Sequence, residues 1–217
     1  MIKLKKVHKK YENGYVALEN INLVINKGEF VYIVGPSGSG KSTLLNCIFR
    51  SEVPSAGMIY IDNYLLTDLS NRQVPFLRRN IGMIFQDFKL LNDRTIFDNI
   101  ALPLQIIGYE HSKIVEQVKN ILSKLSLENR TNMYPFELSG GEQQKVCVAR
   151  AIIKKPKIIL ADEPTGNLDP SASDDIIDLL ENESNSGTTI IMATHNYPLI
   201  ENRIKYFLEI NDGKLIS

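Results

Sequence analysis

The sequence has no tryptophan, only two cysteines and no excess of charge of either sign. Cys47 and Cys147 cannot staple a fold of 217 residues, so we expect two reduced, buried thiols on helices in a reducing compartment. Lys and Arg together number 25, and Asp and Glu also number 25. A broad basic surface for gripping a phosphate backbone is therefore not expected, which argues against nucleic acid as a partner.

Long apolar runs are also missing. No stretch approaches the ~18 consecutive apolar residues of a membrane-spanning helix. The segment Met1–Lys10 carries five lysines, and no apolar signal-peptide core follows it. We therefore expect a cytoplasmic chain that could act at a membrane only through another subunit. The lysines alternate with Ile2, Leu4 and Val7, which predicts the solvated face of an edge strand rather than a lipid-binding segment.

What is present is typical of a globular α/β protein. Hydrophobic residues make up 43% and charged residues 23% of the chain, and the length suits a single domain over residues 1–217. Short apolar runs alternate with helical patterns, which predicts a mostly parallel sheet covered on both faces. Strands are predicted at 2–7, 21–25, 30–34, 58–61, 81–85, 157–161, 189–193 and 206–210, with a terminal hairpin that turns at 211–213; helices are predicted at 43–49 and 173–183.

The stretch from Gln86 to Leu138 differs from its surroundings because it has few strand signals. Apolar residues recur there at spacings of three and four, which predicts an amphipathic helix over 112–125. The residues that form this apolar face are Ile114, Val118, Ile121, Leu122 and Leu125. We therefore expect a helical insertion, about residues 87–140, within the α/β chain.

A phosphate-binding loop is predicted where the buried strand 30–34 meets a helix. The pattern G-x-x-x-x-G-K-[ST] is matched by Gly35, Pro36, Ser37, Gly38, Ser39, Gly40, Lys41 and Ser42, and the predicted nucleotide site also includes Thr43. Glycines let successive N–H groups turn inward around phosphate oxygens, and the following helix directs its positive end at the same anion. Lys41 is expected to reach the β- and γ-phosphates, and Ser42 to offer a hydroxyl to Mg²⁺. A merely flexible glycine turn is the alternative, which the strand and helix around it disfavour.

An acidic pair follows the apolar strand 157–161, at the end of a strand where ligands bind in open α/β sheets. Asp162 would hold Mg²⁺ largely through water, and Glu163 would polarise the attacking water. The alternative is a carboxylate pair that caps a helix, with which Pro164 is compatible. Together with the phosphate-binding loop, the pair indicates a nucleotide hydrolase.

A second candidate anion site lies about 100 residues after the first. A serine and two glycines precede a helix expected to reach Ile153, so free N–H groups and a hydroxyl would face an anion. These residues are Ser139, Gly140, Gly141 and Glu142. The site would bind the far side of the same nucleotide, in the same or another copy of the chain. An ordinary capped helix explains the residues equally well when they are taken alone.

With these motifs in order, nearly the whole chain resembles the ATP-binding cassette (ABC) ATPase family. The further matches are Tyr11 for the aromatic that stacks on adenine, Gln86 for the Q-loop glutamine, 138–144 for the signature motif, Asn167–Asp169 for the D-loop and His195 for the switch histidine. Departures are small: Lys145 stands where arginine is common, and Cys147 where a small residue is common. Neither residue touches the expected chemistry.

The resemblance implies a fold and an assembly. The fold would be that of a P-loop nucleotide hydrolase, with a mostly parallel core sheet, an N-terminal antiparallel β-subdomain and a helical subdomain that carries the signature motif. Two copies would pack head to tail. Each ATP would lie between the P-loop of one copy and residues 139–142 and Asp169 of the other.

The resemblance also assigns roles. Lys41, Glu163, His195 and Gln86 would be catalytic: His195 would contact the γ-phosphate and orient the water and Glu163. Mg²⁺ would be held by Ser42, Gln86 and Asp162. Gln86 would sense the nucleotide and couple it to the helical insertion, which docks a short helix of an integral membrane subunit on the inner face of the plasma membrane.

Within the family, Ile81–Thr95 resembles the cell-division branch, whose ATPase works with a membrane partner to regulate cell-wall hydrolases. The alternative is an exporter subunit of the lipoprotein-release or macrolide type. Residues 196–198, Asn-Tyr-Pro, depart from the aspartate common after the histidine in many relatives. A DNA-repair ABC ATPase would carry a long heptad insertion between its nucleotide motifs, and this chain has none.

Overall fold

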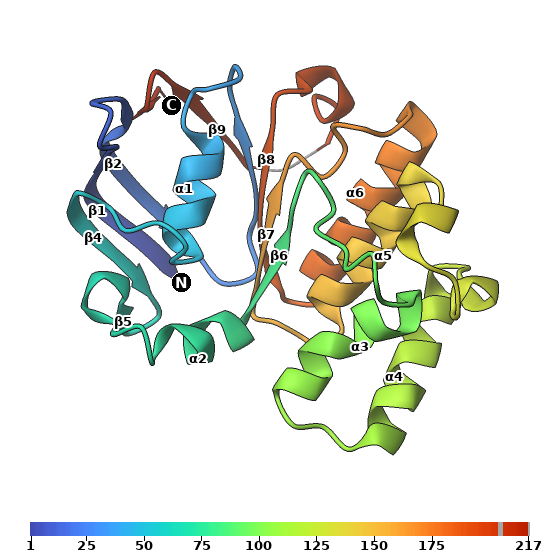
Figure 1. Cartoon of the computed structure of the whole chain (residues 1–217). Coiled ribbons are helices and arrows are strands. Elements are labelled where there is room, and N and C mark those ends of the chain that lie inside the picture. The colour runs from blue at the N-terminus through green and yellow to red at the C-terminus, as the bar shows by residue number, and fades with distance from the viewer. Residues whose placement is uncertain (204–205, 217) are drawn as a thin grey trace.

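The computed structural model describes residues 1–203 and 206–216, which form two sheets with helices between and beside them (Figure 1). The first sheet is antiparallel, in the order β2-β1-β4-β5. The second has the order β10-β9-β3-β8-β7-β6, and all its neighbours are parallel except β10 and β9. The expected parallel core sheet with an N-terminal antiparallel sheet is thus confirmed.

The strands and helices have the following bounds. The strands are β1 (Ile2–Lys10), β2 (Val16–Ile25), β3 (Phe30–Val34), β4 (Ala56–Ile61), β5 (Tyr64–Leu65), β6 (Ile81–Ile84), β7 (Ile158–Asp162), β8 (Thr189–Thr194), β9 (Tyr206–Asn211) and β10 (Lys214–Leu215). The helices are α1 (Lys41–Ile48), α2 (Val74–Arg79), α3 (Ile96–Ile106), α4 (His111–Lys124), α5 (Gly140–Ile152) and α6 (Pro170–Asn185). Short 3₁₀ turns lie at η1 (Leu66–Asp68), η2 (Glu128–Arg130), η3 (Pro135–Glu137) and η4 (Tyr197–Leu199).

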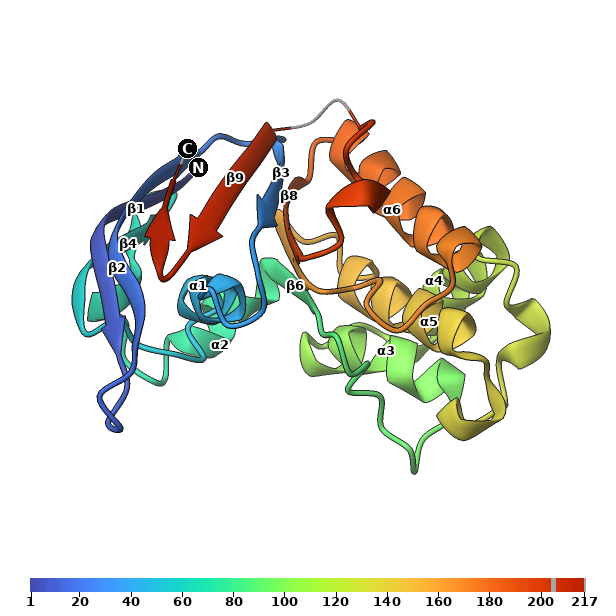
Figure 2. The same cartoon turned by 90° about the horizontal axis from the view of Figure 1, so that it is seen from above.

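The core sheet is apolar because it is covered on both faces. β8 is buried at every residue, as expected for an inner parallel strand. One face packs on α1, which lies between the two sheets, and the other packs on α5 and α6 (Figure 2). The half-buried β2, by contrast, alternates buried and exposed residues over most of its length.

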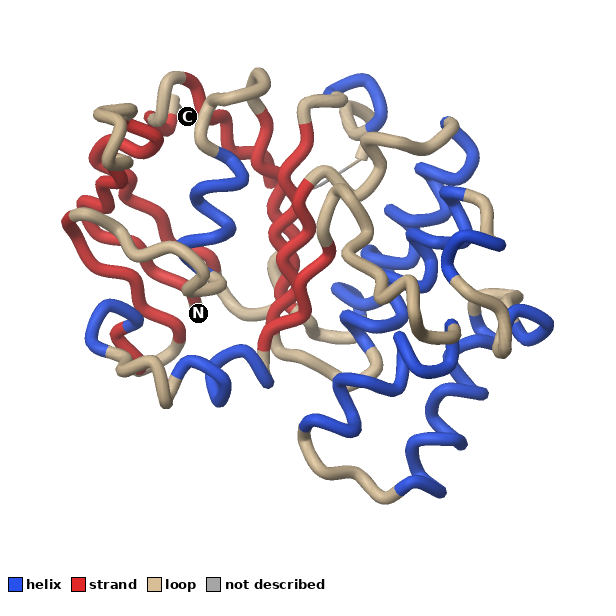
Figure 3. The backbone as a smooth tube through the Cα atoms, viewed as in Figure 1, coloured by secondary structure: helices blue, strands red, loops and turns tan. Residues whose placement is uncertain are grey.

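The predicted helical insertion shares its apolar core with α5. α3, α4 and α5 bury a third cluster of residues, to which α4 contributes the predicted face of Ile114, Val118, Ile121 and Leu122. Figure 3 shows α3 and α4, in blue, away from the strands, in red, whereas α5 also packs on the core sheet. No helix among the described residues is long and apolar enough to cross a bilayer.

The prediction of an edge strand at the N-terminus is wrong. β1 pairs with β2 on one side and with β4 on the other, so it is an interior strand. The alternation of lysines with apolar residues reports which face of the sheet is solvated, not whether a second strand lies alongside. The second neighbour, β4, begins only at Ala56. The residues of β1 contain no pattern that predicts pairing with a strand so far along the chain.

Both cysteines are buried and free, as expected. Cys47 is 0% and Cys147 is 1% exposed. Burial raises the pKa of each thiol to about 12, so neither is a thiolate near neutral pH.

Candidate nucleotide-binding site

Three neighbouring strands deliver the predicted site residues to one edge of the core sheet. β3 leads into the phosphate-binding loop, β7 ends in Asp162 and is followed by Glu163, and β8 is followed by His195 (Figure 1). Because β3, β8 and β7 are parallel neighbours, their carboxyl ends meet at the same edge. This is the position at which open α/β sheets bind ligands.

The phosphate-binding loop is shaped by backbone contacts that only glycine allows. Gly35 has φ 151° and Gly40 has φ 110°. A Cβ on Gly35 would collide with the carbonyl of Ile210, and one on Gly40 with the carbonyl of Ala17. The backbone of the loop therefore packs directly against β9 and β2, which leave no room for a side chain at these two positions. Gly40 is the last residue of the loop and the N-cap of α1.

Lys41 and Ser39 give this loop its polar interior. Lys41 is 5% exposed, and its Nζ donates to the carbonyls of Gly35 at 2.8 Å and Pro36 at 2.9 Å. The buried hydroxyl of Ser39 has no hydrogen-bond partner within residues 1–203 and 206–216. A buried cation and an unpaired buried hydroxyl fit a loop that receives phosphate oxygens.

Ser42 and Asp162 lie together. The Ser42 hydroxyl donates to Asp162 Oδ1 at 2.9 Å, although the residues are 120 positions apart. Burial raises the pKa of Asp162, and the hydrogen bond from Ser42 opposes this shift. The described residues hold no group of three His, Cys, Asp or Glu side chains able to bind a metal. A hydroxyl and a carboxylate beside a phosphate loop fit Mg²⁺, which takes its other ligands from phosphate and water.

Glu163 and His195 form a hydrogen-bonded pair. His195 Nδ1 is 2.9 Å from Glu163 Oε2, and the backbone N–H of His195 donates to the same oxygen at 3.2 Å. The other carboxylate oxygen is 3.8 Å from Lys41 Nζ. Glu163 is 7% exposed and has φ 48°, a conformation that costs a non-glycine residue energy and is enriched at functional sites.

Gln86 lies beside the D-loop. Its Nε2 is 3.5 Å from the place where a Cβ on Gly166 would be, and its carbonyl accepts from Asn167 Nδ2 at 3.4 Å. The chain after it is held by α5, a contact that sequence reasoning missed. Arg150 donates to the carbonyls of Lys89 at 2.7 Å and Phe88 at 2.8 Å, both residues having positive φ.

Two tyrosines flank the loop. Tyr11 Oη is 3.2 Å from Thr43 Oγ1, so the predicted adenine-stacking ring lies beside the first turn of α1. Tyr15, which sequence reasoning missed, donates to the carbonyl of Gly38 at 2.6 Å. The two rings are nearly parallel at 12°, with centroids 6.4 Å apart. In the sequence, the only indication that Tyr15 lies near Tyr11 is their spacing of four residues across a tight turn.

The second candidate anion site lies at the start of α5. Ser139 caps this helix through a reciprocal capping box with Glu142. A cavity of about 290 Å³ there is lined by Ser139, Gly140, Gly141, Glu142, Lys145, Asn167, Leu168, Asp169 and Ala172. It brings the predicted signature motif and D-loop together. None of residues 35–43 lines it, so within one chain the two anion sites are separate.

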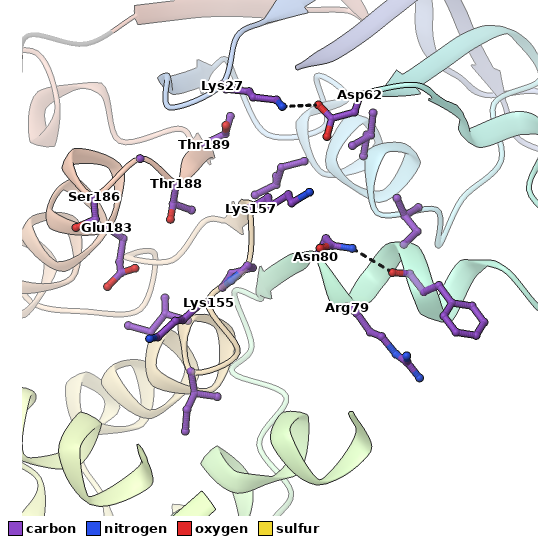
Figure 4. Close-up of a pocket in the computed structure, with 18 of the residues that line it drawn as sticks. Lys27, Asp62, Arg79, Asn80, Lys155, Lys157, Glu183, Ser186, Thr188 and Thr189 are labelled. Carbon is purple, nitrogen blue, oxygen red and sulfur yellow. Dashed lines mark hydrogen bonds and ion pairs between the residues drawn. The ribbon is translucent and has the colours of Figure 1, made fainter. Parts of the chain in front are cut away.

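A larger cavity lies elsewhere among the described residues. It has a volume of about 1600 Å³ and is lined by residues just before β3, β6, β7 and β8, including Lys27, Asn80, Lys157 and Thr188 (Figure 4). It therefore opens at the amino ends of the core strands, opposite the phosphate loop. We call it the amino-end groove.

Comparison with known proteins gives the family. Residues 18–166 match the model described as ABC transporter. The chain belongs to this family, as one of its ATP-hydrolysing cassettes, and the ABC ATPase prediction is confirmed. It is 45% identical to "Cell division ATP-binding protein FtsE" of Bacillus subtilis (strain 168), with 100% of this chain and 95% of the relative covered. It is 47% identical to the FtsE of Escherichia coli (strain K12), covering 99% and 97%.

Solved cassettes share the fold. "Dimeric structure of a post-hydrolysis state of the ATP-binding cassette MJ0796 bound to ADP and Pi" superposes with a TM-score of 0.91 at 39% identity, covering 100% of this chain and 97% of that one. A second MJ0796 structure, titled "Dimeric Structure of MJ0796, a Bacterial ABC Transporter Cassette", gives 0.91 at 40% identity over the same shares.

Proposed function

We propose that two copies of the chain bind two ATP molecules head to tail. Each nucleotide lies between the phosphate loop of one copy and residues 139–142 and Asp169 of the other. The observation that carries this proposal is the separation of the two anion sites within one chain: no residue of the phosphate loop lines the cavity at residues 139–142. The MJ0796 cassette, which is dimeric with ADP and Pi bound, supports a nucleotide-bound dimer.

The residues divide the chemistry between them. Lys41 leaves the loop carbonyls to contact the β- and γ-phosphates, and Tyr11 stacks on the base. Ser42 and Asp162, with Gln86, hold Mg²⁺, which when bound neutralises charge on the phosphates. Glu163 takes a proton from the attacking water, and His195 keeps the Glu163 carboxylate in place through their 2.9 Å contact and reaches toward the γ-phosphate.

We further propose that the chain acts in bacterial cell division as an FtsE-type ATPase, on the inner face of the plasma membrane. Its partner there is an integral membrane subunit of the FtsX type, and opening and closing of the dimer regulates cell-wall hydrolases across the membrane. The relatives named FtsE, matched over nearly their whole length, support this role over an exporter of the lipoprotein-release or macrolide type.

We also propose that the helical subdomain, about residues 87–140, docks this partner through the loop before α3. Asn99 is 0% exposed and fixes the loop: its Oδ1 accepts from Leu91 N–H at 2.8 Å, and its Nδ2 donates to the carbonyls of Leu91 and Thr95. The loop therefore presents the side chains of Asp93, 82% exposed, and Arg94, 61% exposed.

The test is charge reversal on this loop. Asp93→Lys with Arg94→Glu is expected to reduce capture of the co-expressed FtsX-type subunit severalfold, because both side chains project into solvent from a fixed loop. The Mg-ATP melting shift should stay unchanged, since neither residue contacts the phosphate loop. Lys5→Glu, an exposed reversal on β1, is the matched control. Equal capture by all variants would contradict docking at this loop.

A further inference from the structure

Glu142 presents a problem for the proposed dimer. It lies in the first turn of α5 and lines the cavity that is proposed to receive the γ-phosphate side of a partner's ATP. A carboxylate there already occupies the positive end of the helix and repels an incoming anion. Asp169 lines the same cavity, and the cation Lys145 is already paired with Asp175 at 2.8 Å.

We propose that Arg130 is a positioning residue that neutralises Glu142 and so allows the Ser139 site to accept the ATP of a second copy of this chain. The inference rests on the proposed function. Nothing in the sequence motifs points to Arg130, which precedes the signature motif and lies in the turn η2.

The contacts connect Arg130 to Ser139 through one carboxylate. Arg130 Nε donates to Glu142 Oε1 at 2.9 Å. The other oxygen, Oε2, accepts from both the backbone N–H and the hydroxyl of Ser139, each at 2.9 Å. Hydrogen bonds from Arg130 and from the Ser139 backbone hold the pKa of Glu142 below its usual range, so the carboxylate is ionised at neutral pH.

Arg130 is itself fixed by the backbone around it. Its N–H donates to the Leu127 carbonyl at 2.9 Å, and its carbonyl accepts from Met133 N–H at 3.0 Å. The N–H groups of Ile96 and Phe97 donate to the carbonyls of Met133 and Thr131, so the chain that carries the guanidinium is anchored to the start of α3. The guanidinium balances the charge of Glu142 at Oε1, so an incoming phosphate meets an ion pair beside the Ser139 hydroxyl instead of an unpaired carboxylate.

This arrangement predicts which step depends on Arg130. ATP binding to a single chain uses the phosphate loop, which Arg130 does not line. Closure of the dimer uses the Ser139 site. Loss of Arg130 should therefore weaken ATP-dependent dimer formation and leave the first binding event unchanged.

The experiment is a double-mutant cycle in the Glu163→Gln chain with Mg-ATP. Dimer dissociation constants are measured by analytical ultracentrifugation. Single-chain ATP binding is measured by the melting shift at a protein concentration below these constants, where dimer formation does not add to the shift. We expect Arg130→Met to weaken the dimer at least tenfold with an unchanged melting shift. Arg130→Lys should keep most of the affinity. Arg130→Met with Glu142→Gln should regain the affinity of Glu142→Gln alone, because no carboxylate is then left to neutralise.

Each outcome separates the explanations. If Arg130→Met dimerises like its parent, Arg130 has no positioning role and the inference is wrong. If Glu142→Gln fails to rescue Arg130→Met, Arg130 acts as structural support of the turn, which also overturns the inference. If the Glu163→Gln parent itself stays monomeric, the head-to-tail dimer or the role of Glu163 is wrong, and the inference, which rests on that function, fails with it.

Discussion

Replacing Glu163 with glutamine is expected to trap the chain as an ATP-bound dimer. Glutamine keeps the size of glutamate and an oxygen that can accept from the backbone N–H of His195, now donated to Glu163 Oε2 at 3.2 Å. It cannot take a proton as a carboxylate does. Loss of a positioned general base slows chemistry by ~10²-fold or more. Both anion sites remain intact, so the closed dimer should accumulate because hydrolysis normally releases it.

Analytical ultracentrifugation of Glu163→Gln with Mg-ATP at tens of micromolar measures this outcome. The control adds Ser139→Arg to the same chain, because a bulky cation at the start of α5 would obstruct the partner's nucleotide while leaving the phosphate loop untouched. That double variant should be monomeric. A monomeric Glu163→Gln chain would argue against the head-to-tail dimer or against the role of Glu163. If Glu163→Gln hydrolyses ATP at the wild-type rate, Glu163 is not a catalytic residue.

The parts of the fold that follow from local patterns could be predicted from the sequence. The apolar run 30–34 is β3 to the residue, and the amphipathic pattern over 112–125 is α4 shifted by one position. Both patterns are set by the residues themselves. The helix α3 was covered only by the general expectation of a helical insertion, because Pro103 and apolar residues on several sides obscure its period.

Long-range pairing could not be predicted in this way. The interior position of β1 depends on β4, and β5 and α2 are short elements with no strong period. The amino-end groove is formed by segments from Met1 to Thr189, so it exists only once the sheets and α4 are assembled.

The candidate site shows the same difference between features set by local sequence and features set by long-range packing. Motif spacing predicted site residues that follow strands, such as Lys41 and Glu163, and the structure brings them together because parallel strands end at the same edge of the sheet. Motif spacing missed Tyr15, Asn99, Arg130 and Arg150, which hold loops or neighbouring side chains in place. Arg150, for example, reaches the carbonyl of Lys89 across 61 positions. A contact of this kind depends on how α5 packs against the segment after β6, which no short motif encodes.

Replacing Lys41 with alanine is expected to abolish ATP binding. Its Nζ is the buried cation of the phosphate loop, now held by the carbonyls of Gly35 and Pro36 at 2.8 and 2.9 Å. A ligand at a hundredfold excess over its Kd stabilises the native state by about 2.7 kcal/mol. For a chain of this size that corresponds to a rise in Tm of roughly 5–10 °C. The wild-type chain should show this rise with Mg-ATP, and Lys41→Ala should not.

The comparison is made within each variant, with and without Mg-ATP, because loss of the Lys41 contacts also changes the Tm of the free protein. Lys157→Ala is the matched control: it removes an exposed lysine that lines the amino-end groove, at the opposite end of the core strands. It should keep the full ATP-dependent rise. An equal rise in Lys41→Ala would contradict the phosphate loop as the nucleotide site. If Lys157→Ala instead loses the ATP-dependent rise in Tm, the result would indicate that ATP binds in the amino-end groove, where none of the predicted catalytic residues lies.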